Sequence, residues 1–164
     1  MIILGIDPGI ALVGYGVVEF IGNKFRLLEY GVIQTHVSQT TDDRLKIIYD
    51  QMLDIIDDYQ PDEVVYEKLF HQKNTKTFIN VSQARGVEIL AAKVRGLDVY
   101  EYTPLQIKTA LTGYGRADKR QMQEAVNRIL GLKEIPRPDD AADALAIAIC
   151  HCFSIKFKDM FKMK

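Results

Sequence analysis

The pattern of apolar and polar positions predicts three β-strands within the first 34 residues. Residues 2–6 form an uninterrupted apolar run, which is typical of a strand buried on both faces. Two further strands are predicted over residues 14–20 and 25–34, with Ile21, Gly22 and Asn23 as the turn between them. Together the three segments indicate an antiparallel meander at the start of the chain.

Beyond residue 40, segments with helical periodicity alternate with two short strands. Apolar residues recur every three or four positions over residues 41–59, residues 38–41 offer N-cap candidates, and Pro61 separates this helix from the next strand. The two short strands are predicted over residues 63–67 and 99–102. The other predicted helices cover residues 77–95, 104–111, 117–130 and 139–155.

This order of elements predicts an α/β fold, with a mixed five-stranded sheet and helices on both of its faces. The 164 residues suit one domain, which we expect to span residues 1–155, followed by a flexible basic tail at residues 156–164. No apolar run has the length of a transmembrane helix, and the N-terminus lacks the basic region of a signal peptide. We therefore expect a cytoplasmic protein that has no membrane partner.

The formal net charge of -1 conceals an uneven distribution of charge along the chain. Residues 1–67 contain four basic and twelve acidic side chains, whereas residues 68–95 contain six basic and one acidic. Basic side chains also outnumber acidic ones over residues 104–137 and in the tail. This pattern fits a polyanionic ligand such as a nucleic acid, and a solvated surface of mixed charge would explain it equally well.

Four carboxylates, those of Asp7, Glu67, Asp140 and Asp143, lie at the ends of predicted buried elements. Each alone has a structural explanation: Asp7 can begin a type II turn with the Pro-Gly that follows it, Glu67 can end a strand, and the last two can cap a helix. Charges in such positions are costly to bury unless a cation compensates them, and hard divalent cations prefer carboxylate oxygens. The joint pattern therefore predicts metal-assisted chemistry on phosphate.

The last predicted helix offers two alternative pairs of acidic ligands. Asp140 and Asp143 are three residues apart and therefore share one face of the helix. Asp139 and Asp143 are four residues apart and share a face as well, so the spacing does not choose between Asp139 and Asp140. Asp139 is also a candidate N-cap after Pro138.

Five motifs, in order along nearly the whole chain, resemble the RuvC family of Holliday junction resolvases. They are residues 4–9 (LGIDPG), 14–17 (GYGV), 67–70 (EKLF), 83–86 (QARG) and 140–148 (DAADALAIA). The resemblance implies an RNase H-like fold, a homodimer, and nicking of four-way DNA junctions that depends on Mg²⁺, with two ions per active site and Mn²⁺ as a substitute. It also implies that Asp7, Glu67, Asp140 and Asp143 are catalytic metal ligands and that RuvA and RuvB are partners.

Basic and aromatic residues near these motifs are candidates for DNA contacts. The resemblance implies that Lys108 and Lys119 lie near the cleaved phosphate and that Phe70 stacks on an unpaired base at the junction centre. Each also has a plainer interpretation, as a solvated lysine or a core phenylalanine. Further contacts to backbone phosphates are expected from basic residues in the loops, namely Lys73, Lys76 and Arg116.

The predicted helix 77–95 is the candidate dimer interface. Ser82 and Gly86 are small and four residues apart, so a second copy of this helix could approach closely there. The opposite face is expected to pack on the sheet of its own subunit through apolar residues, namely Val87, Leu90, Ala91 and Val94.

Three alternative functions compete with junction cleavage. An RNase H-like nuclease could act on another structure, such as an RNA–DNA hybrid, with the same fold and metal chemistry. An ATP-binding module of the actin or sugar-kinase type shares the first strand motif, but the chain has no second glycine-rich phosphate loop. A junction-binding protein without catalytic activity would have no need of all four acids.

Overall fold

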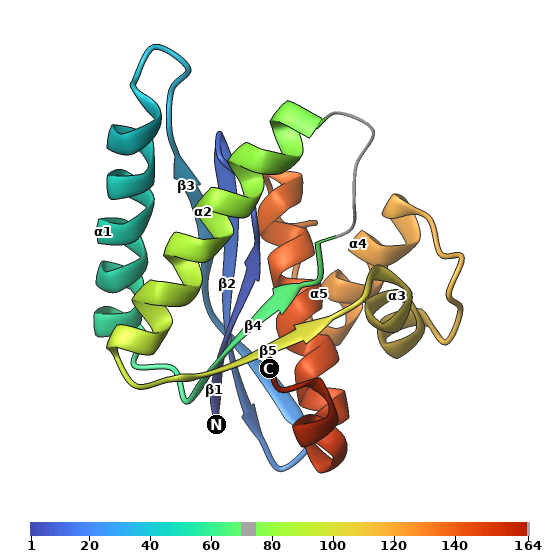
Figure 1. The fold of residues 1–164 in the computed structure, drawn as a ribbon. Coiled ribbons are helices and arrows are strands. Elements are labelled where there is room, and N and C mark those ends of the chain that lie inside the picture. Colours follow the sequence, from blue (N-terminus) through green and yellow to red (C-terminus); the bar gives the residue numbers. More distant parts are fainter. Residues whose placement is uncertain (70–74, 164) are drawn as a thin grey trace.

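The computed structural model describes residues 1–69 and 75–163, and of Thr75 and Lys76 it describes the backbone only. Its single described sheet has the order β3-β2-β1-β4-β5. Strands β1, β2 and β3 pair in antiparallel fashion, whereas β4 runs parallel to β1 and β5 parallel to β4. The predicted mixed five-stranded sheet is therefore confirmed (Figure 1), with strands β1 Ile2–Asp7, β2 Leu12–Ile21, β3 Lys24–Gln34, β4 Glu63–Glu67 and β5 Asp98–Tyr102.

Helices cover both faces of this sheet (Figure 1). One face packs against α1 and α2, and the other packs against α5, with α3 and α4 beside it. All predicted strands and helices agree with the structure to within two residues. The helices are α1 Thr41–Tyr59, α2 Thr75–Val94, α3 Pro104–Thr112, α4 Lys119–Leu130, α5 Asp139–Ser154 and the 3-10 helix η1 Ile155–Phe161.

Local sequence signals explain where the helices begin and end. Thr40 caps α1 by accepting a hydrogen bond from the backbone N–H of Asp43. Thr103 and Asp118 each form a capping box at the start of α3 and α4, and Gly113 and Gly131 end these helices in the left-handed conformation. The expectation that Asp139 caps α5 is wrong, because Pro138 occupies the cap position and makes no side-chain hydrogen bond.

Two glycines allow α5 to lie unusually close to the sheet. A Cβ atom on Gly5 of β1 would lie 2.2 Å from the backbone oxygen of Ala144, and one on Gly14 of β2 would lie 2.1 Å from that of Asp140. Any larger residue at either position would force the helix away from the strands. The close approach brings the acidic first turns of α5 against the end of β1.

The C-terminal segment differs from the flexible tail that its composition suggested. After η1, the Met163 N–H donates a hydrogen bond to the Val99 oxygen at 2.9 Å, so the chain runs beside β5. Lys158 forms an ion pair with buried Glu63, and Lys162 forms one with Asp98 at 2.8 Å. These partners lie more than 60 residues away in sequence, which local composition does not reveal.

No helix in the described part of the chain is long and apolar enough to cross a membrane.

Candidate active site

The carboxyl ends of β1 and β4 bring two of the predicted acids to one edge of the sheet. Asp7 is the last residue of β1 and Glu67 the last of β4, and the residues before them, Ile6 and Tyr66, are partners in the parallel pair. Side chains alternate along a strand, so Asp7 and Glu67 face α5, on the side of the core that contains Val65. Ligand sites in such sheets lie at the carboxyl ends of the strands.

The turn after Asp7 is not the predicted type II turn. Gly9 does not adopt the positive φ that such a turn requires at this position. A glycine is still needed there, because a Cβ atom would lie 1.9 Å from the backbone oxygen of Leu12. The rigid support of Asp7 thus comes from close packing of the turn rather than from a left-handed backbone.

Electrostatic interactions show that the four acids converge. Burial raises the pKa of Asp7 to about 8, with further contributions from the negative charges of Asp143, Glu67 and Asp140. Burial likewise raises the pKa of Glu67, and Asp143 adds to that shift. The pKa of Asp143 is raised by burial, against the attraction of Lys119, and by the charges of Asp139 and Asp140. Acids from β1, β4 and α5 therefore form one cluster of mutually repelling charge.

The cluster fits a divalent cation in its chemistry and charge but is not arranged as a finished coordination site. Among the described residues, no three His, Cys, Asp or Glu side chains lie close enough together to hold one ion as they stand. Side chains that repel one another are expected to stand apart until a cation draws them together. Burial is the main cause of the raised pKa of Asp7, and repulsion from the other acids adds to it; a bound Mg²⁺ would offset both.

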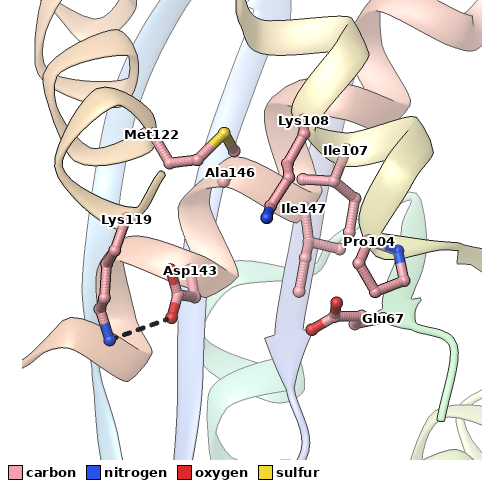
Figure 2. A pocket seen from close by; sticks show the side chains of 9 residues that line it. All are labelled: Glu67, Pro104, Ile107, Lys108, Lys119, Met122, Asp143, Ala146 and Ile147. Carbon is pink, nitrogen blue, oxygen red and sulfur yellow. Dashed lines mark ion pairs between the residues drawn. The ribbon is translucent and has the colours of Figure 1, made fainter. Parts of the chain in front are cut away.

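A cavity of about 300 Å³ opens beside the acids (Figure 2). Lys108 from α3 and Lys119 from α4 both line it, and Lys119 lies beside Asp143. Its remaining wall is largely apolar, which was not predicted from the sequence. The available signal was helical spacing, since Pro104 is four residues from Lys108 and Met122 is three residues from Lys119. These wall residues are Pro104, Ile107, Met122, Ala146 and Ile147.

Asp139 has a different environment from the other acids of α5. Its carboxylate accepts hydrogen bonds from Arg137 at 2.8 Å and Gln123 at 2.9 Å, and it pairs with Lys119 at 3.0 Å. The hydrogen bond with Lys119 is the main reason that the pKa of Asp139 is lowered. Asp140, and not Asp139, is among the charges that raise the pKa of Asp7. Asp139 thus holds a lysine at the rim of the site.

The predicted DNA contacts are only partly visible. Phe70 and Lys73 lie outside the described residues, as does the side chain of Lys76. Arg116 is exposed in the loop between α3 and α4 and does not line the cavity. Lys108 and Lys119 are therefore the predicted basic residues that the structure brings to the acids.

The outer face of α2 differs from its prediction. Leu90 and Val94 were expected to pack on the sheet, but each is 54% exposed. The buried face of α2 instead consists of Glu88 and small residues, namely Ala84, Ala91 and Ala92. The helix can therefore lie close to the strands, and larger aliphatic side chains such as Leu90 and Val94 are exposed. Gly86 is exposed with no atom within 4 Å of a Cβ placed there, as a closely approaching helix would require.

Comparisons with known proteins agree with this geometry. The family model of the crossover junction endodeoxyribonuclease RuvC matches residues 3–151. The RuvC of Finegoldia magna is 58% identical over 164 residues, covering 100% of both chains. The Thermus thermophilus RuvC structure is 37% identical, with a TM-score of 0.92, and the match covers 99% of this chain and 100% of that one. The predicted RNase H-like fold is confirmed, and the chain belongs to the RuvC family of crossover junction endodeoxyribonucleases.

Proposed function

We propose that this chain cuts four-way DNA junctions by hydrolysing phosphodiester bonds at the site formed by Asp7, Glu67, Asp140 and Asp143. One observation carries the assignment: the paired ends of β1 and β4 place Asp7 and Glu67 at one edge of the sheet, where Glu67 and Asp143 line a cavity together with Lys108 and Lys119. A divalent cation shared by the acids explains this concentration of negative charge. The substrate is inferred from the family, since the Thermus thermophilus relative was solved in complex with a Holliday junction substrate, at 37% identity and a TM-score of 0.94.

Mg²⁺ fits this donor set, because carboxylate oxygens are its preferred protein ligands, and Mn²⁺ suits the same oxygens. Two bound ions supply an activated water and a stabilised leaving oxygen in such reactions. Asp7, Glu67, Asp140 and Asp143 would hold the ions. Lys108 and Lys119, which line the cavity beside them, would attract the phosphate and offset its charge.

Junction DNA would be held by basic side chains around this cavity. Arg116 is exposed and available for a backbone phosphate. Phe70 remains a proposed base-stacking residue, and Lys73 and Lys76 remain proposed phosphate contacts, because all three follow Glu67 within nine residues of the sequence. Contacts of this kind position DNA without reading its sequence.

A homodimer would give two active sites for two symmetric cuts. The exposed aliphatic side chains of α2, among them Ile79, Leu90 and Val94, flank the open surface at Gly86. A second copy of α2 is the natural partner for this face, because a twofold axis places the same surface on both sides. Assembly with RuvA and RuvB and a cytoplasmic location are further inferences from the family.

Cleavage of matched substrates tests the function. A four-way junction, a linear duplex and an RNA–DNA hybrid are incubated with the protein at increasing Mg²⁺ concentrations. We expect the junction to be cut in preference, with paired symmetric nicks. Preferential cutting of the hybrid would instead assign the chain to a different nuclease activity.

Single substitutions test the site. Asp7→Asn, Glu67→Gln, Asp140→Asn and Asp143→Asn are each expected to abolish cutting while junction binding, measured by gel shift, persists. Asp50→Asn, which alters an exposed acid on α1 paired with Lys46, serves as the control and should cut normally. Normal cutting by Asp140→Asn together with loss of cutting by Asp139→Asn would contradict the assignment of Asp140.

A further inference from the structure

The chain neighbours of Glu67 are held from the opposite face of the sheet. Side chains alternate along β4, so Glu67 faces the cavity while Tyr66 faces α2. Tyr66 is fully buried. The next residue, Lys68, donates its backbone N–H to the Tyr102 oxygen at 2.8 Å, which fixes the chain just beyond Glu67. The position of Glu67 therefore depends on what holds Tyr66 and Lys68.

Arg85 of α2 contacts the first of these neighbours. Its guanidinium carbon lies 5.7 Å from the centre of the Tyr66 ring, within the range of a cation–π interaction. The guanidinium also donates a hydrogen bond from Nη2 to Glu101 Oε2 at 2.8 Å. The side chain of Arg85 is only 15% exposed, so this pair is weakly screened by solvent.

Glu101 of β5 links Arg85 to the second neighbour. It is the register partner of Tyr66 in the parallel pair of β4 and β5. Its other carboxylate oxygen, Oε1, lies 3.3 Å from Lys68 Nζ. Arg85 and Glu101 thus contact the residue before Glu67 and the residue after it.

This arrangement connects Glu67 to the outer surface of α2. Arg85 points inward from the helix, and the next residue, Gly86, lies on the exposed face that also contains Leu90. A partner that docks on this face would hold α2 in place. Through its contacts with Tyr66 and Glu101, Arg85 would then restrain the end of β4. No residue of this connection touches the cavity.

We propose that the Arg85–Glu101 pair is a positioning clamp, which holds Glu67 in the orientation needed to bind Mg²⁺ and links that orientation to α2. The proposal rests on the proposed function, since it takes Glu67 as a metal ligand. Partners that orient a metal ligand typically change metal affinity by about 10–100-fold when removed. Loss of the clamp should therefore weaken Mg²⁺ binding more than it weakens DNA binding.

Arg85→Gln and Glu101→Gln, singly and together, test the clamp. Two quantities are measured: the Mg²⁺ concentration that gives half of the maximal thermal stabilisation without DNA, and the Mg²⁺ concentration that gives half-maximal junction cleavage. Each single variant is expected to raise both concentrations about 10-fold, with little change in junction affinity. The effect of the double variant should be less than the sum of the two single effects, because both substitutions remove the hydrogen bond between Arg85 and Glu101.

Arg95→Gln is the matched control. It breaks another arginine–carboxylate pair next to α2, in which Arg95 donates two 2.6 Å hydrogen bonds to Asp57, away from Glu67. It should leave both Mg²⁺ concentrations unchanged. If Arg85→Gln and Glu101→Gln lower the melting temperature but keep the wild-type Mg²⁺ concentrations, the pair is only structural and the proposal is overturned.

Glu67→Gln separates this proposal from the proposed function. Complete loss of Mg²⁺ stabilisation in Glu67→Gln, combined with wild-type behaviour of the clamp variants, would reject the clamp alone. Wild-type Mg²⁺ stabilisation in Glu67→Gln would instead reject Glu67 as a ligand, and the clamp with it.

Discussion

The Lys119 ammonium group lies 3.8 Å from a carboxylate oxygen of Asp143, at the edge of the acid cluster. Its charge lowers the pKa of Asp143 and that of Asp7, in opposition to the larger effect of burial. Lys108 likewise lowers the pKa of Glu67, so the protein supplies two cations next to acids whose pKa values remain raised. Figure 2 shows this ion pair at one side of the cavity, with Lys108 entering from another helix.

Replacing Lys119 with methionine should separate metal binding from catalysis. Without the ammonium group, the acids lose a competing cation, so Mg²⁺ should stabilise Lys119→Met at lower concentration than it stabilises the wild type. Cleavage of the bound junction should slow by about 100-fold, because charge that stabilises the transition state is lost. Thermal unfolding with Mg²⁺ and single-turnover cleavage measure the two effects.

Arg120→Gln is the control for this substitution, since the neighbouring Arg120 is exposed and paired with Glu124. Arg120→Gln should change neither the Mg²⁺ concentration needed for thermal stabilisation nor the rate of cleavage. Weaker Mg²⁺ binding by Lys119→Met would show that the lysine orders the acids rather than competing with the metal.

Replacing Asp7 with asparagine should abolish cutting and should stabilise the metal-free protein increasingly as the pH rises from about 4 to 8. The folded pKa of Asp7 is about 8, above its ordinary value of 3.8. Between these values the folded protein retains a proton that the unfolded chain releases, so stability falls as the pH rises. Asparagine removes this cost, and we expect a gain on the order of 2 kcal/mol at pH 8.5 in EDTA. Urea unfolding at pH 5 and pH 8.5 measures it; equal stability of both proteins at pH 8.5 would contradict the prediction.

Glu88 is a second carboxylate whose burial opposes stability. It is fully buried on the inner face of α2, and neither of its oxygens has a hydrogen-bond partner among the described residues. Burial raises its pKa from 4.5 to about 8, partly offset by the charge of Arg85. As the pH rises from 4.5 through 8, the wild type must either retain this proton or bury a charge, and it loses stability.

Glu88→Gln should therefore stabilise the protein increasingly as the pH rises above 4.5. We expect little change at pH 5 and a gain on the order of 3 kcal/mol at pH 9, from urea unfolding in EDTA. Glu134→Gln, at an exposed loop position, is the control and should have the same stability as the wild type at both pH values. A gain that is equal at pH 5 and pH 9 would show that charge is not its cause.

The mixed five-stranded sheet and the ends of its strands could be predicted because their signals are local: Asp7 and Glu67 end apolar runs. The choice of Asp140 over Asp139 came from the family resemblance, because the spacing along the helix fits both. The inner face of α2 could not be predicted in this way, because apolarity favours Leu90 and Val94 over Glu88 for burial. The buried face of α2 is determined by its close packing on the strands, which depends on the sizes of side chains that are far apart in sequence.

The same reason explains why the ordered C-terminal segment was not predicted. Glu63, at the start of β4, accepts hydrogen bonds from His151 at 2.6 Å and from Lys158, and Tyr100 donates to it as well. Burial alone would raise the pKa of Glu63, but the bonds from Lys158 and His151 outweigh it and lower the pKa. Sequence spacing gives no hint that Lys158 has a partner 95 residues away.

Lys158→Met should destabilise the protein without affecting catalysis. The substitution leaves Glu63 buried with fewer donors, which costs about 1–3 kcal/mol. Because the pKa of Glu63 is lowered in the folded state, its contribution is present above its ordinary pKa of 4.5 and is lost as the pH falls through the folded value. The deficit of Lys158→Met, measured by urea unfolding, should therefore be large at pH 7 and smaller in acid. Lys162→Met removes an exposed ion pair with Asp98 and should have little effect on stability.

Junction cleavage should be unchanged in both variants, because Glu63 lies at the opposite end of β4 from Glu67. Slower cutting by Lys158→Met under conditions where it is fully folded would instead connect the C-terminal segment to the active site.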